Sequence, residues 1–246
     1  MLAKKSLGQN WLRSERVARQ IIATANLGPG ETVLEIGPGQ GFLTKFLLET
    51  GARVIAVEKD DRLIELLQGK FAGKKLNLIH GDILELEIDL PKRYKLVANL
   101  PYYITGQALR QFLESENQPE KMVLMLQDEV AKRIVAKDGK ESLLSIAVKA
   151  FGQPKYVEKV LAKCFTPIPK VHSAILSIEK ISKDNFIKVD ETKFFEIVKR
   201  GFGSKRKMLR NHLNVSPVIF TKCGISETGR AENLTLENWL CLAEQV

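Results

Sequence analysis

The sequence predicts an α/β fold, with a mainly parallel sheet covered by helices on both faces and a small all-α region after it. Over the N-terminal two thirds of the chain, short β-rich apolar runs alternate with longer helical patterns. Strands that alternate with helices of about ten residues indicate right-handed crossovers and parallel pairing. After Lys180 no convincing strand pattern follows, and the remaining patterns are helical.

The expected strands are apolar runs rich in β-branched residues: Thr32–Ile36, Arg53–Glu58, Leu76–His80, Lys95–Asn99 and Met122–Gln127. The expected helices have apolar residues at helical spacing: Ser14–Ala25, Gly41–Glu49, Asp60–Lys70, Thr105–Glu114, Glu129–Val135 and Leu143–Ala150. Two later strands, Tyr156–Leu161 and Ala174–Ile181, have only 12 residues between them. So short a connection favours an antiparallel excursion at the sheet edge.

The polar segment Ser182–Asp190 separates the alternating strand and helix patterns from a part with helical patterns only, and this change predicts a domain boundary. We expect one domain over residues 1–185 and a helical domain over residues 186–246. The helices expected in the second domain are Glu191–Gly201, Ser204–Leu213, Pro217–Cys223 and Leu236–Glu244.

Composition narrows the class of protein. The 246 residues are 44% hydrophobic, and 38 Lys and Arg against 29 Asp and Glu give a formal net charge of +9. Positive charge of this size favours a polyanionic partner. No apolar run approaches the roughly 18 residues of a membrane span, and the N-terminus lacks the apolar region of a signal peptide. We therefore expect a cytoplasmic protein without a membrane partner, and a monomer by default.

The cysteines predict neither a metal site nor a disulfide framework. Cys164, Cys223 and Cys241 form no C-x-x-C pair, and the three histidines make no ligand cluster with them. We expect reduced, mostly structural thiols and no bound metal.

A glycine-rich turn joins the first expected strand to a helix. It reads Val33-Leu-Glu-Ile-Gly-Pro-Gly-Gln-Gly41, with glycines at positions 37, 39 and 41. Such glycines allow a sharp turn and close approach of a ligand, although a tight turn without a ligand is the simpler alternative. The dinucleotide pattern G-x-G-x-x-G requires its third glycine where Phe42 stands, so NAD is disfavoured.

The pattern E-x-G-x-G-x-G resembles the first motif of class I S-adenosylmethionine methyltransferases, which have a Rossmann-like sheet. The resemblance implies that Gly37 and Gly39 pass under the methionine part of this cofactor. Glu58 ends the next strand, 21 residues after Gly37, where a carboxylate can accept hydrogen bonds from both ribose hydroxyls. By the same resemblance Asp82 would accept from the adenine amine, and Ile83 would pack against the ring. The alternatives are that Glu58 is a surface carboxylate at the start of a helix and that Asp82 is a simple turn residue.

The segment Asn99-Leu-Pro-Tyr102 follows the fourth strand, at the sheet edge where open α/β folds bind ligands. The Asn99 amide oxygen and the Leu100 carbonyl before Pro101 can both accept hydrogen bonds from an amino group. The Tyr102 ring offers a face on which a base can stack, worth about 1–3 kcal/mol. The methyl group on a sulfonium is already activated, so orientation of the amine supplies much of the catalysis. Alone these four residues could form a turn; after the cofactor motifs they indicate amine methylation.

The flanking motifs narrow the family. Asn99-Leu-Pro-Tyr-Tyr-Ile-Thr-Gly106 resembles the N-L-P-Y-x-I-[ST] segment of the ribosomal RNA adenine dimethyltransferases. Gly8-Gln-Asn-Trp-Leu12 resembles their G-Q-N-F-L, with Trp11 in place of phenylalanine. The segment from Phe165 to Ala174 resembles F-x-P-x-P-K-V-D-S-A, with His172 in place of aspartate.

This resemblance implies roles for particular residues. Asn10 and Leu12 would close over the cofactor, while Asn99 would both complete the cofactor pocket and hold the target amine. Tyr102 and Phe165 would sandwich the adenine. The alternative for Phe165 is a core aromatic beside a proline loop.

A basic segment from Lys199 to Arg210 contains six basic residues and no acidic one. It resembles the family's R-R-K-x-L-R-N, and we expect its cations to bind RNA phosphates: Lys199, Arg200, Lys205, Arg206, Lys207 and Arg210. A solvated helix face is the alternative. Arg230-Ala-Glu-Asn-Leu-Thr-Leu236 resembles an element of the small-subunit enzymes.

The sequence thus predicts an enzyme that dimethylates adenines, expected to be two adjacent ones, in small-subunit ribosomal RNA and serves subunit biogenesis. Its partner would be the small subunit, in a pre-30S-like particle. One alternative is a large-subunit RNA methylase of the macrolide-resistance type. Another is an assembly or transcription factor whose catalysis is dispensable. Methylation of glutamine or DNA adenine fits the four residues from Asn99 to Tyr102 but not the flanking motifs.

Overall fold

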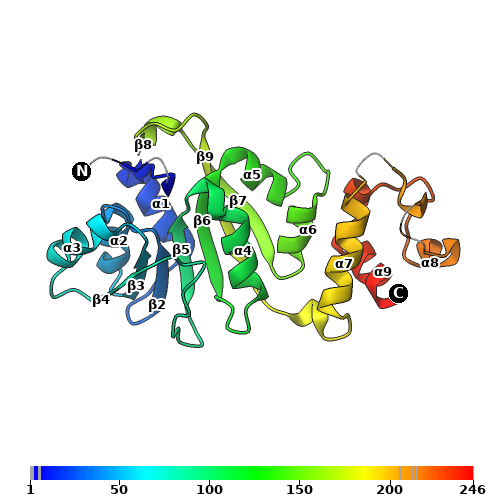
Figure 1. The fold of residues 1–246 in the computed structure, drawn as a ribbon, viewed down its shortest axis with the longest axis horizontal. Helices are drawn as coiled ribbons and strands as arrows, with labels where there is room; N and C mark the ends of the chain where they lie inside the picture. The colour runs from blue at the N-terminus through cyan, green and yellow to red at the C-terminus, as the bar shows by residue number, and fades with distance from the viewer. Residues whose placement is uncertain (1–2, 5–6, 205–206, 212, 214, 246) are drawn as a thin grey trace. The chain divides into compact units, whose positions relative to one another are not determined.

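The computed structural model describes residues 3–4, 7–204, 207–211, 213 and 215–245 (Figure 1). The chain divides into two compact units. The first comprises Met1–Ala131 and Lys155–Ile181, and the second comprises Lys132–Pro154 and Ser182–Val246. The division at residue 185 into a methyltransferase domain and an RNA-binding domain stays a prediction, because compactness does not show what each part binds.

A seven-stranded sheet forms the centre of the first unit, and its strands lie side by side in Figure 1. Its order is β4-β3-β2-β5-β6-β9-β7. The strands are β2 (Thr32–Ile36), β3 (Arg53–Glu58), β4 (Leu76–His80), β5 (Lys95–Asn99), β6 (Lys121–Gln127), β7 (Gln153–Val160) and β9 (Ser173–Glu179). Strands β2 to β6 pair in parallel, whereas β9 pairs antiparallel with β6. The predicted parallel sheet with an antiparallel return is confirmed.

The strand register brings the carboxyl ends of the parallel strands to one edge. Ile36 pairs with Val57, and Glu58 pairs with His80. Asn99, the last residue of β5, pairs with Met125. The glycine turn, Glu58 and Asn99 therefore meet at the edge where open α/β sheets bind ligands.

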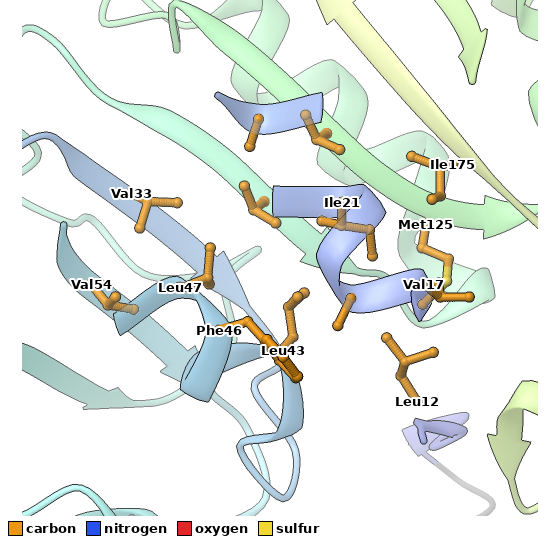
Figure 2. Close-up of a cluster of buried hydrophobic side chains, with 14 of the residues drawn as sticks. Leu12, Val17, Ile21, Val33, Leu43, Phe46, Leu47, Val54, Met125 and Ile175 are labelled. Atoms are coloured by element: carbon orange, nitrogen blue, oxygen red, sulfur yellow. The ribbon is translucent and has the colours of Figure 1, made fainter. Parts of the chain in front are cut away.

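Three helices cover one face of this sheet: α1 (Glu15–Ala25), α2 (Phe42–Glu49) and α3 (Asp61–Lys70). Figure 2 shows side chains from α1, α2 and the strands meeting in one cluster; its labelled members include Val17, Ile21, Phe46, Leu47, Val33, Val54, Met125 and Ile175. Full burial of such side chains contributes roughly 1.5–3 kcal/mol each. This cluster anchors the glycine turn between β2 and α2.

The opposite face of the sheet is buried as well. Leu34, Leu96 and Leu124 alternate with the residues of the first cluster and are fully buried. Helix α4 (Thr105–Glu114) buries Leu109 and Phe112 on its apolar side. Burial on both faces explains why these strands are nearly continuous apolar runs.

Two short strands bring the N-terminal segment to the proline loop. Strand β1 (Trp11–Leu12) pairs antiparallel with β8 (Phe165–Thr166), so Leu12 lies opposite Phe165. Two-residue strands have no periodicity, which is why the sequence did not predict them. The pairing holds residues that are about 150 positions apart at one end of the sheet.

The second unit contains helix α6 (Leu143–Lys149) in its first segment. Its C-terminal segment contains α7 (Glu191–Phe202), α8 (Pro217–Lys222) and α9 (Leu236–Gln245). The Asp190 side chain caps α7 by accepting from the Lys193 N–H. Helices α7 and α9 pack closely, because a Cβ on Gly201 would lie 2.2 Å from the buried Trp239 ring. No described helix is long and apolar enough to cross a membrane.

The prediction of an α-helix over Ser204–Leu213 is wrong for the described residues. Helix α7 ends at Phe202, and among the described residues the next regular structure is a 3-10 turn over Leu209–Asn211. Leu209 is fully buried, and its N–H donates to the Gly229 carbonyl at 3.0 Å. A helix through this segment would engage that N–H internally, so tertiary pairing outweighs the local pattern.

The expectation of reduced thiols is wrong for two of the three cysteines. Cys223 and Cys241 form a disulfide, with Cα atoms 5.6 Å apart. They follow α8 and lie within α9, respectively. Cys164 is a free, half-buried thiol. The sequence did not predict this disulfide, because the two cysteines are 18 residues apart in no recognisable motif and only helix packing brings them together.

Candidate active site

A pocket of about 720 Å³ lies at the carboxyl ends of β2, β3 and β5. Most predicted site residues line it: Asn10, Gly37, Gly39, Glu58, Asp82, Ile83, Asn99, Leu100, Pro101 and Tyr102. The other lining residues are Leu7, Gly8, Gln9, Trp11, Ile36, Val57, Lys59, Gly81, Tyr103 and Ile104. The structure thus brings together residues from four separate motifs.

The glycines of the turn give the pocket its floor. Gly37, Gly39 and Gly41 have φ values of 66°, 58° and 75°, a region that side chains disfavour. A Cβ on Gly39 would lie 2.9 Å from the Trp11 ring, whereas a Cβ on Gly37 would meet nothing within 4 Å. Gly37 therefore leaves open space in which a ligand can approach the backbone.

Glu58 presents a buried carboxylate to the pocket. One oxygen accepts from the Gly39 N–H at 2.9 Å and the other from the Asp60 N–H at 2.8 Å. Burial raises the pKa of Glu58, although these backbone hydrogen bonds oppose the rise. Each oxygen keeps further acceptor capacity, so the carboxylate could accept from two hydroxyls of a ribose.

Asp82 follows β4 and is held at both carboxylate oxygens. Oδ2 accepts from the Lys59 ammonium at 2.5 Å, and Oδ1 accepts from the Leu84 N–H at 3.0 Å. Burial alone would raise the pKa of Asp82, but these hydrogen bonds outweigh it and lower the pKa. Beside it, buried Ile83 offers an apolar surface, and its carbonyl accepts from Gln111 at 2.8 Å.

The N-terminal segment closes one side of the pocket. Gln9 Nε2 donates to Asp60 Oδ2 at 2.8 Å, which ties this segment to the turn after Glu58. Arg62 also donates to Asp60, and its hydrogen bond is the main cause that lowers the pKa of that carboxyl. The ionised Asp60 therefore anchors Gln9 beside the pocket.

The Asn99 side chain is oriented by the same N-terminal segment. Its Nδ2 donates to the backbone carbonyl of Asn10 at 3.0 Å. The next residue, Leu100, is 2% exposed and donates its N–H to the Met125 carbonyl at 3.1 Å. With its amide nitrogen engaged, Asn99 has its oxygen available as an acceptor for an amino group.

Tyr102 is fixed from the sheet. Its hydroxyl lies 2.9 Å from the hydroxyl of Ser173, which is fully buried at the start of β9. Burial raises the pKa of Tyr102, so the phenol stays neutral at ordinary pH. The next residue, Tyr103, is 57% exposed at the pocket and packs against Gly8.

Two predicted residues lie elsewhere. Phe165 is 2% exposed within the hydrophobic cluster and is not among the residues that line the pocket. Leu12 belongs to the same cluster and lines a neighbouring hollow instead. The stacking role of Phe165 stays a prediction, and it would require the side chain to leave this cluster.

The predicted RNA-binding cations belong to the second unit. Lys199 and Arg200 are exposed in the last turn of α7, and the Arg200 guanidinium donates to the Leu213 carbonyl at 3.3 Å. Lys207 and Arg210 are exposed, and Arg210 pairs with Glu227 at 3.0 Å. Lys205 and Arg206 lie outside the described residues.

Sequence reasoning missed several residues of the site. Gln9, Lys59 and Tyr103 are sequence neighbours of predicted site residues, and this proximity could have indicated that they line the pocket. Ser173 lies in a recognised motif, but nothing local indicates that it meets Tyr102 across 71 positions. Among the described residues, no group of three or more His, Cys, Asp or Glu could hold a metal ion.

The fold and pocket together define a class I methyltransferase. A glycine floor with open space at Gly37, a buried carboxylate and a second acidic acceptor fit the methionine, ribose and adenine parts of S-adenosylmethionine. The family model described as ribosomal RNA adenine dimethylase matches residues 1–246, and the chain belongs to this family. Enzymes of this family use S-adenosylmethionine.

Similar proteins agree with this assignment. A protein of Dehalococcoides mccartyi strain CBDB1, named ribosomal RNA small subunit methyltransferase A, is 47% identical over 98% of this chain and 88% of its own length. A protein of the same name from Thermosynechococcus vestitus is 40% identical, over 98% of this chain and 96% of its own.

Two solved structures extend the likeness to the whole fold. A dimethyladenosine transferase from Plasmodium falciparum has a TM-score of 0.80 and 25% identity, covering 94% of this chain and 95% of its own. The 23S ribosomal RNA methyltransferase ErmE has a TM-score of 0.79 and 27% identity, covering 96% and 99%.

Proposed function

We propose that this chain transfers methyl groups from S-adenosylmethionine to the exocyclic amines of two adjacent adenines in small-subunit ribosomal RNA, two to each adenine. The observation that carries this proposal is the placement of Asn99. Its amide nitrogen is engaged by the Asn10 carbonyl within the pocket, so its oxygen is the group left to receive a substrate amine.

The proposed cofactor contacts follow from the pocket. Glu58 would accept from the ribose hydroxyls, and Asp82 would accept from the adenine amine beside the apolar surface of Ile83. The backbone of Gly37 and Gly39 would lie under the methionine part, with Asn10 and Leu12 closing over it. When bound, this cofactor supplies a methyl group already activated by a positively charged sulfur.

The proposed catalytic groups orient the amine. The Asn99 oxygen and the Leu100 carbonyl would each accept one N–H, which directs the nitrogen lone pair away from them. Pro101 favours the extended backbone of Leu100 that presents this carbonyl. Tyr102, held by Ser173, would stack on the base. No strong general base is required, because the methyl group on the sulfonium is already activated and orientation of the amine supplies much of the catalysis. A second transfer requires a fresh molecule of the cofactor, room for the monomethylated amine, and rotation about its carbon–nitrogen bond so that the remaining N–H faces an acceptor.

The names of the relatives favour the small subunit as substrate. The curated relatives that are 36–47% identical are named small subunit methyltransferase A, whereas ErmE, a 23S enzyme, is 27% identical. The basic residues Lys199, Arg200, Lys207 and Arg210, together with Lys205 and Arg206, would hold RNA phosphates.

The finer features of the substrate complete the proposal. We propose that the substrate is an immature, pre-30S-like particle in which the target adenines are unpaired and can enter the pocket. We propose that the chain acts on it as a monomer, in the cytoplasm where subunits assemble.

The test uses tritiated S-adenosylmethionine and small subunits from a strain without this modification, with wild type and Asn99→Ala compared in parallel. Immature and mature particles form separate arms, and large subunits form another. We expect dimethyladenosine in small-subunit RNA with wild type only, and more of it with immature particles.

Other results would overturn the proposal. Label confined to large-subunit RNA would assign the macrolide-resistance activity. Label on neither subunit, with binding of cofactor and subunit intact, would assign a non-catalytic assembly factor. An Asn99→Ala variant that still restored subunit maturation would show a separate binding role.

A further inference from the structure

Lys59 follows the last residue of β3 and lines the active-site pocket, but it has no role among the proposed cofactor contacts. The parallel register of β3 and β4 pairs Glu58 with His80. The Gly81 N–H extends this pairing, because it donates to the Glu58 carbonyl at 2.9 Å. The chain therefore leaves the two strands at neighbouring points, which places Lys59 beside Asp82.

The Lys59 ammonium holds one oxygen of this aspartate. It donates to Asp82 Oδ2 at 2.5 Å, and the two side chains are 50% and 16% exposed. The other oxygen, Oδ1, accepts from the Leu84 N–H at 3.0 Å. A bond to the backbone two residues on is common for an aspartate in a turn. Lys59 adds the second contact, which fixes the orientation of the carboxylate plane.

The charges of the two groups support each other. Burial disfavours the ionised form of Asp82, but the hydrogen bonds from Lys59 and Leu84 outweigh it and lower the pKa of Asp82. The hydrogen bond to Asp82 and the charge of that carboxylate raise the pKa of Lys59. Asp82 is therefore ionised at neutral pH, and an ionised carboxylate accepts hydrogen bonds but donates none.

Asp82 keeps room for a ligand. A carboxylate offers about four acceptor positions, and the contacts with Lys59 and Leu84 use one on each oxygen. The neighbouring apolar surface of Ile83 is held in place by Gln111, which donates to the Ile83 carbonyl at 2.8 Å. An aromatic ring that lies on Ile83 can thus donate an N–H to Asp82 while Lys59 stays bound.

Lys59 also contacts the other acidic group of the pocket. Its backbone N–H donates to the Glu58 carboxylate and contributes to lowering the pKa of that group. One residue thus contacts both proposed acceptors, Glu58 through its backbone and Asp82 through its side chain. A substitution of the Lys59 side chain leaves the backbone contact in place, so it acts on Asp82 alone.

We propose that Lys59 is a positioning residue: it holds Asp82 toward the exocyclic amine of the cofactor's adenine, and it thereby sets the preference of the enzyme for a cofactor that carries this amine. The inference rests on the proposed function for the contact between Asp82 and the amine. An exposed ion pair without such a role would contribute little, but the carboxylate of this pair is largely buried at the pocket.

The test measures, by calorimetry, the binding of S-adenosylhomocysteine and of its analogue with purine in place of adenine, which lacks only the exocyclic amine. Lys59→Met keeps the apolar stem and removes the ammonium, whereas Lys59→Arg keeps the charge. Lys155→Met is the matched control. Lys155, on β7, pairs with Glu179 at 2.6 Å, is 59% exposed and does not line the pocket.

We expect wild type to bind S-adenosylhomocysteine roughly 10- to 100-fold more tightly than the purine analogue, because the analogue leaves a charged acceptor without its donor. Lys59→Met should reduce this preference to about threefold by weakening S-adenosylhomocysteine, with affinity for the analogue within about twofold of wild type. Lys59→Arg should retain most of the preference, and Lys155→Met should behave as wild type.

Three results would overturn the inference. If Lys59→Met bound S-adenosylhomocysteine as tightly as wild type, Lys59 would not position Asp82, and tighter binding would mean that the ammonium competes with the amine. Equal weakening of both ligands would assign Lys59 to the shape of the pocket. Equal affinity of wild type for both ligands would remove the contact between Asp82 and the amine.

Failure of the proposed function would appear in a different measurement. Wild type would then show the expected preference for S-adenosylhomocysteine but would label no small-subunit RNA. The binding comparison uses no RNA, so it would still decide the role of Lys59.

Discussion

The active-site pocket of the first unit and the basic segment of the second unit differ in how their residues are held. In the pocket, Glu58, Asp82 and Asn99 each have named hydrogen-bond partners at 2.5–3.0 Å. In the basic segment, Lys199 and Lys207 are exposed. Methyl transfer depends on the angle and distance of one amine, whereas attraction of phosphate depends mainly on charge.

The two units also differ in net charge. The second unit carries 16 basic and 10 acidic residues, so it holds +6 of the net charge of +9. The first unit, with more residues, holds the remaining +3. The sheet therefore positions the residues of the active site, whereas the positive surface of the second unit follows from its excess of basic residues. Three predictions test this contrast.

The largest effect is expected where a side chain would enter the pocket. Gly37→Ala should weaken binding of S-adenosylhomocysteine by roughly 10- to 100-fold, because the methyl group overfills a ligand site. Gly73→Ala is the matched control: its φ of 72° is similar to the 66° of Gly37, and a Cβ there also meets nothing within 4 Å. Each variant should lose about 1 kcal/mol of stability. Calorimetry and denaturant unfolding measure both quantities, and equal cofactor affinity of the two variants would contradict the prediction.

A smaller effect is expected in the second unit. Lys199→Gln with Lys207→Gln should weaken binding to small subunits by about tenfold at 0.15 M salt through loss of counterion release. Affinity for S-adenosylhomocysteine should not change. Filter binding across a salt series measures this, with a Lys74→Gln and Lys75→Gln variant as the control, because it removes two exposed positive charges of the first unit that do not line the active-site pocket. Cofactor affinity that fell together with RNA affinity would remove the distinction between the two regions.

The smallest effect is expected behind the pocket. Ser173→Ala leaves the Tyr102 hydroxyl without its partner, which costs about 1 kcal/mol and should lower kcat about fivefold. Ser177→Ala removes a buried hydroxyl of the same strand that bonds to Glu179 instead. Steady-state kinetics should show reduced kcat for Ser173→Ala only, with KM for the cofactor unchanged. A similar kcat for both variants would mean that Ser173 has no positioning role.

The sequence predicted best the strands and the site residues that directly follow them, because both depend on the pattern of neighbouring residues. The parallel strands lie within a residue or two of their expected bounds, because a strand buried on both faces is a continuous apolar run. Glu58, Asp82 and Asn99 line one pocket because each stands at or just after the end of a parallel strand. The α-helix predicted over Ser204–Leu213 is absent from the described residues of that range, because the Leu209 N–H donates to the Gly229 carbonyl instead.

By itself, the sequence determined the sheet, the glycine turn and the acceptors that follow each strand, since periodicity and motif spacing are properties of neighbouring residues. Only the tertiary structure decided that Asn10 orients Asn99 across 89 positions, that Phe165 lies in the core, and that Cys223 bonds Cys241. It also brought Arg13 and Lys70 together on Gln40. These contacts join residues that are far apart in the chain, and the pattern of neighbouring residues does not determine which distant segments pack against each other.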